Sequence, residues 1–340
     1  MAKINIGVIG YGYWGPNMVR NFFEAPGSQV TMVSDLRAER LPLVQSRYPT
    51  VRVTQKASEL IEDSHVDAVI ISTPVSSHYE LALQALRAGK HVLVEKPLTA
   101  TLEQAQLLIE EAERRKRVLM VDHTFIYTGA VCKAHDLIAS GELGDVYYYD
   151  SVRVNLGLFQ HDVSVLWDLA VHDLSIMDYI LPMKPVAVSA TSAAHVKGVP
   201  EDVAYLTLLF ESNVIAHVHV NWLAPVKIRR TLIGGSRKMI VYDDLEPSEK
   251  IKIYDKGITL NNDAENVYKL LVGYRTGDMV APQIEGTEAL RTEAIHFLKC
   301  IAEGKQPLTD GQAGLQVVRI LEAATLSIQE KGKPVELKTL

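Results

Sequence analysis

The chain has 340 residues, of which 47% are hydrophobic and 22% charged, a composition that excludes disordered, collagen-like and coiled-coil proteins. A formal net charge of −6 argues against nucleic-acid binding, and the two cysteines, Cys132 and Cys300, form no CxxC pair that would suggest a disulfide framework or a zinc cluster. No apolar run approaches the roughly 18 residues of a membrane span, and the N-terminus does not resemble a signal peptide, so we expect a cytoplasmic protein that does not contact membranes.

The first third of the chain alternates short β-branched runs with helical stretches. The runs are continuously apolar, as in strands buried on both faces of a parallel sheet, and they span residues 4–9, 30–34, 68–72, 91–94 and 118–121. Helices are expected over residues 16–23, 76–88 and 101–116, the last with Thr99 or Thr101 as its N-cap. This alternation predicts an α/β domain with a doubly wound parallel sheet over residues 1–122.

After about residue 122 the pattern changes to longer alternating segments with few helices between them. Strands are expected over residues 146–154, 186–195, 203–210, 214–222, 227–233 and 238–242, and helices over 129–139, 166–181, 287–303 and 311–330. Neighbouring segments without helical crossovers pair naturally as antiparallel strands. Residues 123–340 are therefore predicted to form an α+β domain on one large open, mostly antiparallel sheet.

A glycine-rich loop follows the first predicted strand and fits the pattern G-x-G-x-x-G. Gly10 permits the tight turn, Gly12 lets the backbone approach a pyrophosphate, and Gly15 lets helix and strand pack closely. Asp35 ends the second strand about 20 residues later, where a carboxylate accepts hydrogen bonds from an adenosine ribose. Together these features predict a dinucleotide-binding Rossmann domain.

The residues around Asp35 bear on the choice of dinucleotide. The Asp35 carboxylate repels a 2′-phosphate and favours NAD, whereas Arg37 and Arg40 follow closely and suit a 2′-phosphate, so NADP stays open. Tyr13 and Trp14 are expected to fill space around the loop and to contact the cofactor through their backbone.

A second signal is the sequence Glu95-Lys96-Pro97 at the end of the fourth predicted strand. The carboxyl ends of parallel strands are where such sheets bind ligands, and Pro97 biases Lys96 to an extended conformation. Taken alone, this motif would indicate only a surface lysine. The flanking sequence and the glycine loop are what point to a functional role for Lys96.

The run AGKHVLVEKPL over residues 88–98, together with the glycine loop, resembles the Gfo/Idh/MocA oxidoreductase family. Ser72-Thr73-Pro74 with His78, and the turn GELG at residues 141–144, fit the family in the same order. The resemblance implies a Rossmann domain, an α/β domain with a large open sheet, NAD(P)-dependent oxidation or reduction of sugars and polyols, and a catalytic role for Lys96. The cofactor-binding residues expected besides Gly10, Gly12 and Gly15 are Tyr13, Trp14, Asp35, Leu36, Ser72, Thr73, Pro74, His78, Glu95, Lys96 and His123.

The segment WDLAVHD at residues 167–173 completes the expected site. Asp168 and His172 are four residues apart on a predicted helix, so they project from one face, and Asp-x-x-x-His matches the family's catalytic pattern. Oxidation of a secondary alcohol needs a hydride acceptor, which nicotinamide supplies, and a group that takes the hydroxyl proton. Either Lys96 or His172 could take it. Because imidazole titrates near neutral pH, His172 is the favoured base, with Lys96 stabilising the alkoxide and Asp168 orienting the substrate.

The phrases GYWGPN at residues 12–17 and WDLAVHDLSI at residues 167–176, with the segment 221–244, are closer to one branch of the family, the UDP-N-acetylglucosamine 3-dehydrogenases. That resemblance implies oxidation at C3 of a sugar nucleotide, whose diphosphate calls for basic groups. On a strand, Arg230 would face away from Lys227 and Arg229. The substrate-binding candidates are Lys96, Tyr127, Arg153, Asn155, Gln160, His161, Asp168, His172, Lys227 and Arg229.

Other features match no catalytic pattern. His217 and His219 form an H-x-H pair on one strand face, but no third ligand is placed by the pattern, so sheet packing and no metal are expected. Asp173 and Asp178 are expected to cap the helix or to lie on the surface. The resemblance implies a homodimer or homotetramer through the C-terminal sheet.

Alternatives to the sugar-nucleotide dehydrogenase stay open. One is a free-sugar or inositol dehydrogenase of the same family, which product formation only with UDP-sugars would exclude. Another is a non-catalytic dinucleotide-binding regulator, against which the intact Lys96, Asp168 and His172 argue. A glycosidase that works through transient oxidation is a further option.

Overall fold

The computed structural model describes residues 3–157, 159–160, 163–260 and 272–337. The chain divides into two compact units, the first comprising Met1–Thr128 and Thr287–Glu322, the second Gly129–Gly286 and Ala323–Leu340. His161, one of the predicted substrate residues, lies outside the described residues. Across the described part of the chain, every helix is too short or too polar to cross a bilayer.

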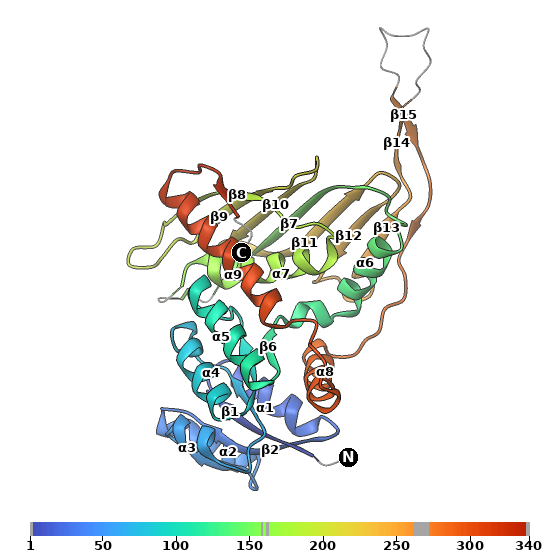
Figure 1. Cartoon of the computed structure of the whole chain (residues 1–340). Helices are drawn as coiled ribbons and strands as arrows, with labels where there is room; N and C mark the ends of the chain where they lie inside the picture. The colour runs from blue at the N-terminus through green and yellow to red at the C-terminus, as the bar shows by residue number, and fades with distance from the viewer. Residues whose placement is uncertain (1–2, 158, 161–162, 261–271, 338–340) are drawn as a thin grey trace. The chain divides into compact units, whose positions relative to one another are not determined.

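The first unit is built on a six-stranded sheet whose described strands are all parallel, in the order β3-β2-β1-β4-β5-β6 (Figure 1). The strands are β1 (Ile4–Ile9), β2 (Ser28–Ser34), β3 (Arg52–Thr54), β4 (Ala68–Ile71), β5 (His91–Glu95) and β6 (Leu119–Asp122). All four residues of β4 are buried, as in a strand covered on both faces. The predicted doubly wound sheet is confirmed, and its strand order reverses between β1 and β4, where such sheets bind ligands.

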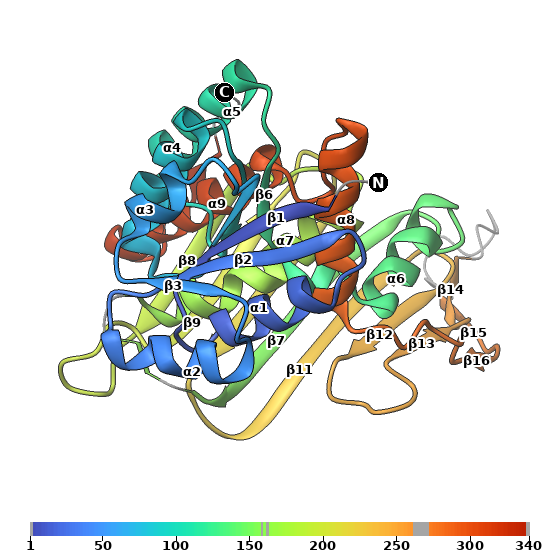
Figure 2. The same ribbon diagram turned by 90° about the horizontal axis from the view of Figure 1, so that it is seen from below.

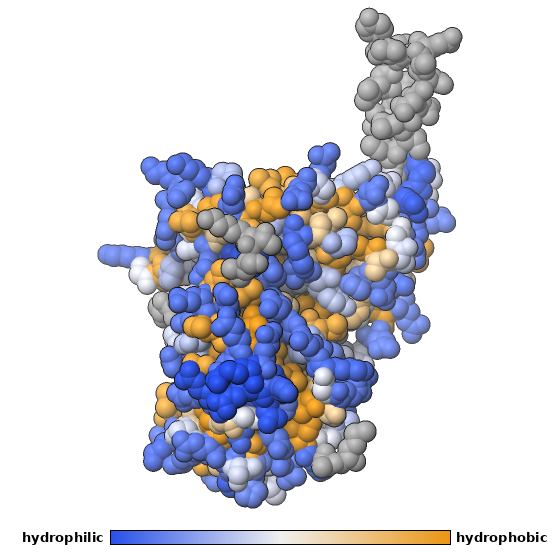
Figure 3. All heavy atoms as spheres, in the orientation of Figure 1, coloured by the Kyte–Doolittle hydropathy of each residue, from blue (hydrophilic) through white to orange (hydrophobic). Residues whose placement is uncertain are grey.

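Helices connect the strands of this sheet. They are α1 (Gly15–Glu24), α2 (Leu41–Arg47), α3 (Ala57–Glu62), α4 (His78–Arg87) and α5 (Leu102–Arg115), with 3₁₀ turns at Ala38–Arg40, Val75–Ser77 and Thr124–Tyr127. Thr101 Oγ1 accepts a hydrogen bond from Gln104 N, so Thr101 rather than Thr99 caps α5. Figure 3 shows hydrophilic side chains over the region of α4 and α5, as expected for the solvent-facing sides of these helices.

Part of the C-terminal chain returns to the first unit. α8 (Ala289–Glu303) and the part of α9 (Gly311–Gln329) up to Glu322 belong to it. Phe22 of α1 meets Phe297 of α8 edge-on, with 6.1 Å between ring centroids, and both rings are buried. The division predicted at residue 122 assigned these helices to the second domain, because a local sequence pattern does not show that a chain returns to an earlier unit.

The second unit is built on a sheet that is nine-stranded over the described residues, in the order β16-β13-β12-β11-β7-β10-β9-β8-β17. Its strands are β7 (Val146–Leu156), β8 (Ala187–Ala193), β9 (Val203–Leu209), β10 (Ile215–Asn221), β11 (Leu223–Gly235), β12 (Met239–Asp243), β13 (Ile251–Tyr254), β16 (Met279–Val280) and β17 (Val335–Glu336). β7 and β10 are parallel, and the other described pairs are antiparallel, which confirms the predicted mostly antiparallel sheet. β14 (Gly257–Leu260) and β15 (Val272–Arg275) pair separately.

Two helices, α6 (Gly129–Ala139) and α7 (Val171–Ile180), cover one face of this sheet (Figure 2). α7 packs against β7 and α6 against β12. On the opposite face Tyr205 stacks on His219, with ring centroids 4.3 Å apart, so the H-x-H segment packs on the sheet as predicted. The described residues contain no group of three or more His, Cys, Asp or Glu side chains that could hold a metal ion.

Candidate active site

The glycine loop between β1 and α1 fits its predicted role in binding a dinucleotide. Gly10 has φ +97°, and a Cβ atom there would lie 2.3 Å from the Ser72 carbonyl oxygen. A Cβ atom on Gly15 would lie 2.2 Å from the Gly10 carbonyl oxygen, so both positions require glycine. Because α1 begins at Gly15, the N–H groups of its first turn lie beside the loop and suit a pyrophosphate.

Asp35 directly follows β2 and is a buried carboxylate. Its Oδ2 accepts a hydrogen bond from Tyr11 N at 2.7 Å, and its Oδ1 accepts one from Arg37 N at 2.9 Å. The Arg37 guanidinium donates to both oxygens at 3.0 Å. Burial raises the pKa of Asp35, but the hydrogen bonds from Arg37 and Tyr11 together outweigh it and keep the pKa below its ordinary value. Asp35 is therefore ionised at neutral pH, and the neighbouring Leu36 is exposed.

Lys96 follows β5 at the carboxyl edge of the parallel sheet, as predicted. Glu95 pairs in register with Asp122 of β6, and the Lys96–Pro97 peptide bond is cis. The positive charge of Lys96 interacts electrostatically with Asp122 and His123, so its ammonium group lies near the end of β6. Within the first unit, the loops after β5 and β6 thus gather the charged groups at one edge of the sheet.

His78, a predicted cofactor residue, links two of these loops. Its Nδ1 lies 2.9 Å from the Pro97 carbonyl oxygen, and its Nε2 lies 2.8 Å from the Thr73 carbonyl oxygen. The side chain is completely buried, and burial lowers the pKa of His78. His78 therefore joins the Ser72-Thr73-Pro74 loop after β4 to the loop that carries Lys96.

A buried pair of acids lies at the same edge of the sheet. Trp14 Nε1 donates to Asp122 Oδ2 at 2.6 Å, which ties the glycine loop to β6, and Thr124 Oγ1 donates to Asp122 Oδ1. The Glu293 carboxyl of α8 is completely buried and interacts electrostatically with Asp122, and neither of its oxygens has a hydrogen-bond partner among the described residues. Burial and then the Asp122 charge raise the pKa of Glu293 well above its ordinary value, so Glu293 is protonated in the folded protein.

Glu293 was not predicted as a site residue. The sequence feature that could have identified Glu293 is an acidic residue on the apolar, buried face of α8, between Leu290 and Phe297. Tyr13, in contrast, is 83% exposed, as expected for a loop residue that contributes mainly its backbone.

His123 and Tyr127 follow β6, where cofactor and substrate contacts were predicted. His123 is completely buried, and neither ring nitrogen has a hydrogen-bond partner among the residues described. Burial and then the Lys96 charge lower the pKa of His123 to about 3, so its imidazole is neutral. The Tyr127 hydroxyl lies 3.0 Å from Thr309 Oγ1 and is buried. His123 therefore offers unsatisfied polar atoms to a ligand, whereas Tyr127 already contacts Thr309.

The second unit carries the Asp168–His172 pair. A π-helix, Leu166–Ala170, leads directly into α7, so the single helix predicted from residue 166 has two helical types. Asp168 Oδ2 accepts a hydrogen bond from Trp222 Nε1 at 3.2 Å, and Trp222 is completely buried. Trp222 was missed because it lies 54 residues along the chain from Asp168. π-helical turns occur frequently at functional sites, and this one contains Asp168 and ends two residues before His172.

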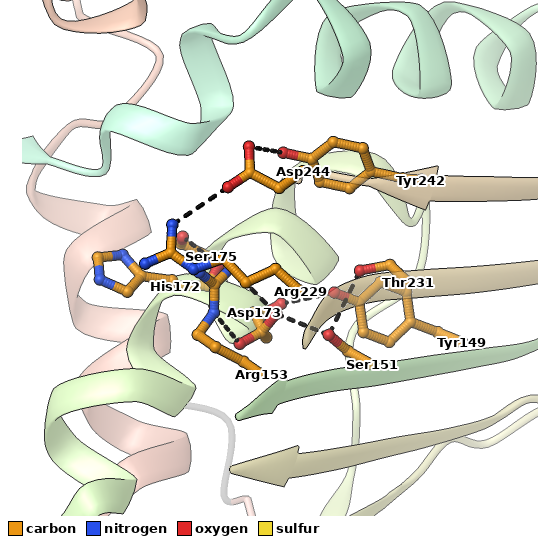
Figure 4. Close-up of polar contacts among 10 residues, drawn as sticks. All are labelled: Tyr149, Ser151, Arg153, His172, Asp173, Ser175, Arg229, Thr231, Tyr242 and Asp244. Atoms are coloured by element: carbon orange, nitrogen blue, oxygen red, sulfur yellow. Dashed lines mark hydrogen bonds and ion pairs between the residues drawn. The ribbon is translucent and has the colours of Figure 1, made fainter. Parts of the chain in front are cut away.

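Arg153 of β7 pairs with the acidic residue next to His172 (Figure 4). Its Nε donates to Asp173 Oδ2 at 2.7 Å, and its Nη2 donates to Asp173 Oδ1 at 3.3 Å. Arg153 and Asp173 are 3% and 2% exposed, so the surface or capping role expected for Asp173 is wrong. A buried carboxylate needs a cation, and Arg153 supplies it.

Arg229 of β11 lies directly opposite Arg153 in the strand register, so the two arginines share one face of the sheet. Its Nη1 donates to Asp244 Oδ2 at 3.1 Å, and Tyr242 Oη donates to Asp244 Oδ1 at 3.2 Å. Figure 4 shows these groups in one close-up with His172. The two arginines on this face of the sheet are therefore each paired with an aspartate, Arg153 with Asp173 of α7 and Arg229 with Asp244 after β12.

The remaining substrate candidates differ in exposure. Lys227 is exposed, and Arg230 pairs with Asp243 at 2.8 Å on the strand face opposite Arg229, as the alternation predicted. Asn155 and Gln160 are half-buried. Each site residue is thus placed within its own unit, Lys96 in the first and Asp168 with His172 in the second.

Two sequence models of one oxidoreductase family match the chain. Residues 4–123 match the Gfo/Idh/MocA model described as an oxidoreductase family with an NAD-binding Rossmann fold. Residues 135–337 match the C-terminal alpha/beta domain of the same family. Together the two matches cover both halves of the predicted site.

Individual relatives cover nearly the whole chain. The UDP-N-acetylglucosamine 3-dehydrogenase of Acidithiobacillus ferrooxidans is 29% identical over 332 residues, 97% of each chain. The myo-inositol 2-dehydrogenase of Thermotoga maritima is 25% identical over 346 residues, 96% of this chain and 97% of its own. A solved structure of a UDP-N-acetylglucosamine 3-dehydrogenase from Acidithiobacillus ferrooxidans has a TM-score of 0.80 at 26% identity, covering 97% of this chain and 99% of that one. The two relatives are named for different substrates, a sugar nucleotide and a cyclic polyol.

Proposed function

Because the chain belongs to the Gfo/Idh/MocA oxidoreductase family, we propose that it uses NAD to oxidise the C3 hydroxyl of UDP-N-acetylglucosamine to a ketone. Relatives in this family are dehydrogenases of sugars and polyols. The 29% identity to a UDP-N-acetylglucosamine 3-dehydrogenase over 97% of both chains supports the substrate. The half-buried Arg229, with its planar guanidinium, supports a substrate that carries a diphosphate.

In this proposal the residues that would bind the cofactor lie in the first unit. The glycine loop and the first turn of α1 would hold the pyrophosphate, and Asp35 would accept hydrogen bonds from the ribose hydroxyls. The ionised Asp35 repels a 2′-phosphate, which favours NAD over NADP. When bound, NAD supplies the nicotinamide ring that accepts a hydride. His123, with two unsatisfied ring nitrogens, would contact the cofactor near Lys96.

A side chain of the protein accepts the proton of the substrate hydroxyl. His172 takes the hydroxyl proton as general base, and Lys96 donates a hydrogen bond to the same oxygen and stabilises its developing negative charge. Asp168 accepts a hydrogen bond from a second sugar hydroxyl and so orients the ring. The alcohol loses one hydride and one proton, which leaves a ketone and a protonated His172. The observation that carries this proposal is the Asp168–His172 pair, with the Asp168 carboxylate bonded to buried Trp222.

The test is turnover on a small panel of alcohols. Purified protein with NAD is incubated with UDP-N-acetylglucosamine, UDP-glucose or myo-inositol, and reduced nicotinamide absorbance and product mass are followed. We expect turnover with UDP-N-acetylglucosamine and a product lighter by two hydrogens. Turnover with myo-inositol alone would mean that the substrate is a free polyol and not a sugar nucleotide. NAD binding without turnover on any alcohol would favour a non-catalytic regulator.

We further propose that the protein forms a homodimer or homotetramer through the second unit's sheet. Tyr205, Leu209 and Ile215 lie on the sheet face opposite α7, and they are 42%, 38% and 47% exposed. Exposed apolar side chains that cluster on one face mark an interaction surface. Light scattering on the purified protein is expected to give a dimer or tetramer, and the variant Y205E is expected to shift it towards monomer. A wild-type monomer at micromolar concentration would contradict this assembly.

A further inference from the structure

Three alternate residues of β7 converge on Asp173 of α7, and we refer to Tyr149, Ser151 and Arg153 as the β7 clamp. Tyr149 Oη donates to the Asp173 backbone carbonyl at 2.9 Å, and Ser151 Oγ donates to Asp173 Oδ1 at 2.6 Å. Arg153 adds its ion pair with the same carboxylate (Figure 4). Because alternate residues of a strand share one face, β7 presents a row of donors to this one acid.

The β7 clamp acts on the residue next to the proposed base. His172 and Asp173 are consecutive, so their Cα atoms are only about 3.8 Å apart. The clamp fixes both the backbone carbonyl and the carboxylate of Asp173, and all four side chains involved are at most 3% exposed. The first turn of α7 therefore cannot rotate on β7 without breaking buried polar contacts, which are costly to lose.

The π-helix before α7 is where such support matters. π-helical turns are rare and occur mostly as single-turn bulges in α-helices, so Leu166–Ala170 depends on tertiary contacts. Asp168 within it is bonded to Trp222, and the β7 clamp holds the turn that follows. We propose that Asp173 is a positioning residue for His172, and that the β7 clamp acts through it to keep His172 aligned with Asp168. This inference rests on the proposed function, in which His172 is the base.

Asp173 also balances charge on the face of the sheet that carries Arg153. Asp244 interacts electrostatically with Arg229, Arg153 and Lys250. The titratable and charged groups on the helix include Asp168, Asp173, Asp178 and Tyr179, and His135 of α6 stacks on Tyr179. On the sheet, Tyr149 and Arg153 of β7 contact Asp173, and Arg229 of β11 connects to Asp244, which also contacts Tyr242 and Lys250. Loss of the Asp173 carboxylate makes their net charge more positive, which disfavours protonation of a nearby imidazole.

The test is the variant D173N, which keeps the shape of the side chain and removes its charge. We expect kcat to fall roughly 10²-fold because the base is misplaced, with the KM for NAD unchanged. The acidic limb of the pH profile of kcat/KM is expected to move to lower pH. A merely structural role would lower stability without moving that limb.

The matched control is D178N. Asp178 lies on the same helix but pairs with Lys184 at 2.6 Å, and the Lys184 side chain is about half exposed. We expect D178N to keep the wild-type kcat and pH profile. A wild-type kcat and pH profile in D173N would overturn the proposal, and so would an equal loss in D178N.

A second variant, S151A, covers the case in which D173N does not fold. It removes one hydrogen bond to the Asp173 carboxylate and no charge, so we expect kcat to fall about 2- to 10-fold with the pH profile unchanged. A wild-type kcat in folded S151A would overturn the proposal.

An NMR titration of the His172 ring separates this proposal from the proposed function. We expect its midpoint to lie at lower pH in D173N than in the wild type, whether or not any alcohol is oxidised. Identical midpoints would overturn the role of Asp173 alone, whereas absence of turnover in the wild type would overturn only the proposed dehydrogenase.

Discussion

Substitution of Glu293 by Gln is expected to raise the free energy of unfolding at neutral pH. Glu293 keeps its proton in the folded protein because burial raises its pKa well above the ordinary value of 4.5. The unfolded chain releases that proton near the ordinary value, so above it folding binds one proton more than the unfolded state. The contribution of Glu293 to the free energy of unfolding then falls by about 1.4 kcal/mol per pH unit until Glu293 ionises in the folded protein. Stability from this group is thus fully present below the ordinary pKa and is lost as the pH rises.

In E293Q the side chain keeps its volume and cannot ionise, so this loss disappears. Urea denaturation followed by circular dichroism, at intervals from about pH 5 to pH 8, measures the slope for wild type and variant. The buried histidines, such as His78 and His123, make stability rise with pH up to about the ordinary histidine value, and they do so equally in both proteins. We therefore expect the difference in free energy of unfolding, E293Q minus wild type, to increase steadily as the pH rises above the ordinary value of Glu293.

E288Q is the control for this experiment. Glu288, near the start of α8, is half exposed, and hydrogen bonding to Arg20 lowers its pKa. Removing this carboxylate should therefore lower the free energy of unfolding slightly at neutral pH, which is the opposite change from that expected for E293Q. The reasoning is refuted if the difference in free energy of unfolding between E293Q and wild type stays constant, or shrinks, as the pH rises over this range.

The other predictions concern single side chains. H172A should lower turnover by roughly 10²-fold or more while calorimetry still detects NAD binding, and near-normal turnover would end its assignment as the base. W222F removes the donor to Asp168 and should lower kcat about 10-fold with unchanged NAD affinity; an unchanged kcat would show that Asp168 is positioned by other contacts. D35N should weaken NAD binding about 10-fold in the same calorimetric assay, and equal affinity would argue against a ribose contact. T101A removes the N-cap of α5 and should cost about 1 kcal/mol in urea denaturation, with no change meaning that the cap is dispensable.

Features encoded within a short stretch of sequence were predictable. The strand, glycine loop and Asp35 form one local unit, and the structure places Gly10 at φ +97° where only glycine fits. α6 was expected over residues 129–139 and has those bounds, because its apolar spacing is helical throughout. Lys96 was predicted as a site residue because its motif resembles the family's, and the structure places it after β5, at the carboxyl edge of the parallel sheet.

Features that depend on distant partners were not predictable. Asp173 was taken for a surface or capping residue because its partner Arg153 lies on a different element, and nothing local marks it as buried. Trp222 and Glu293 were missed for the same reason, since each meets its acid across more than 50 residues of chain. The short elements β3 and α3 were not predicted, because strands and helices of so few residues show no clear periodicity.

The return of α8 to the first unit has a consequence for how the protein is made. During synthesis, residues up to Thr128 emerge from the ribosome long before Thr287–Glu322. Phe22 therefore lacks its partner Phe297, and Asp122 lacks Glu293, until the intervening residues have been synthesised. The nucleotide-binding half is thus completed only after residues 129–286 of the second unit have been synthesised. An excised version of that half would need residues 287–322 spliced directly after residue 128, and a simple N-terminal fragment would expose apolar surface and precipitate.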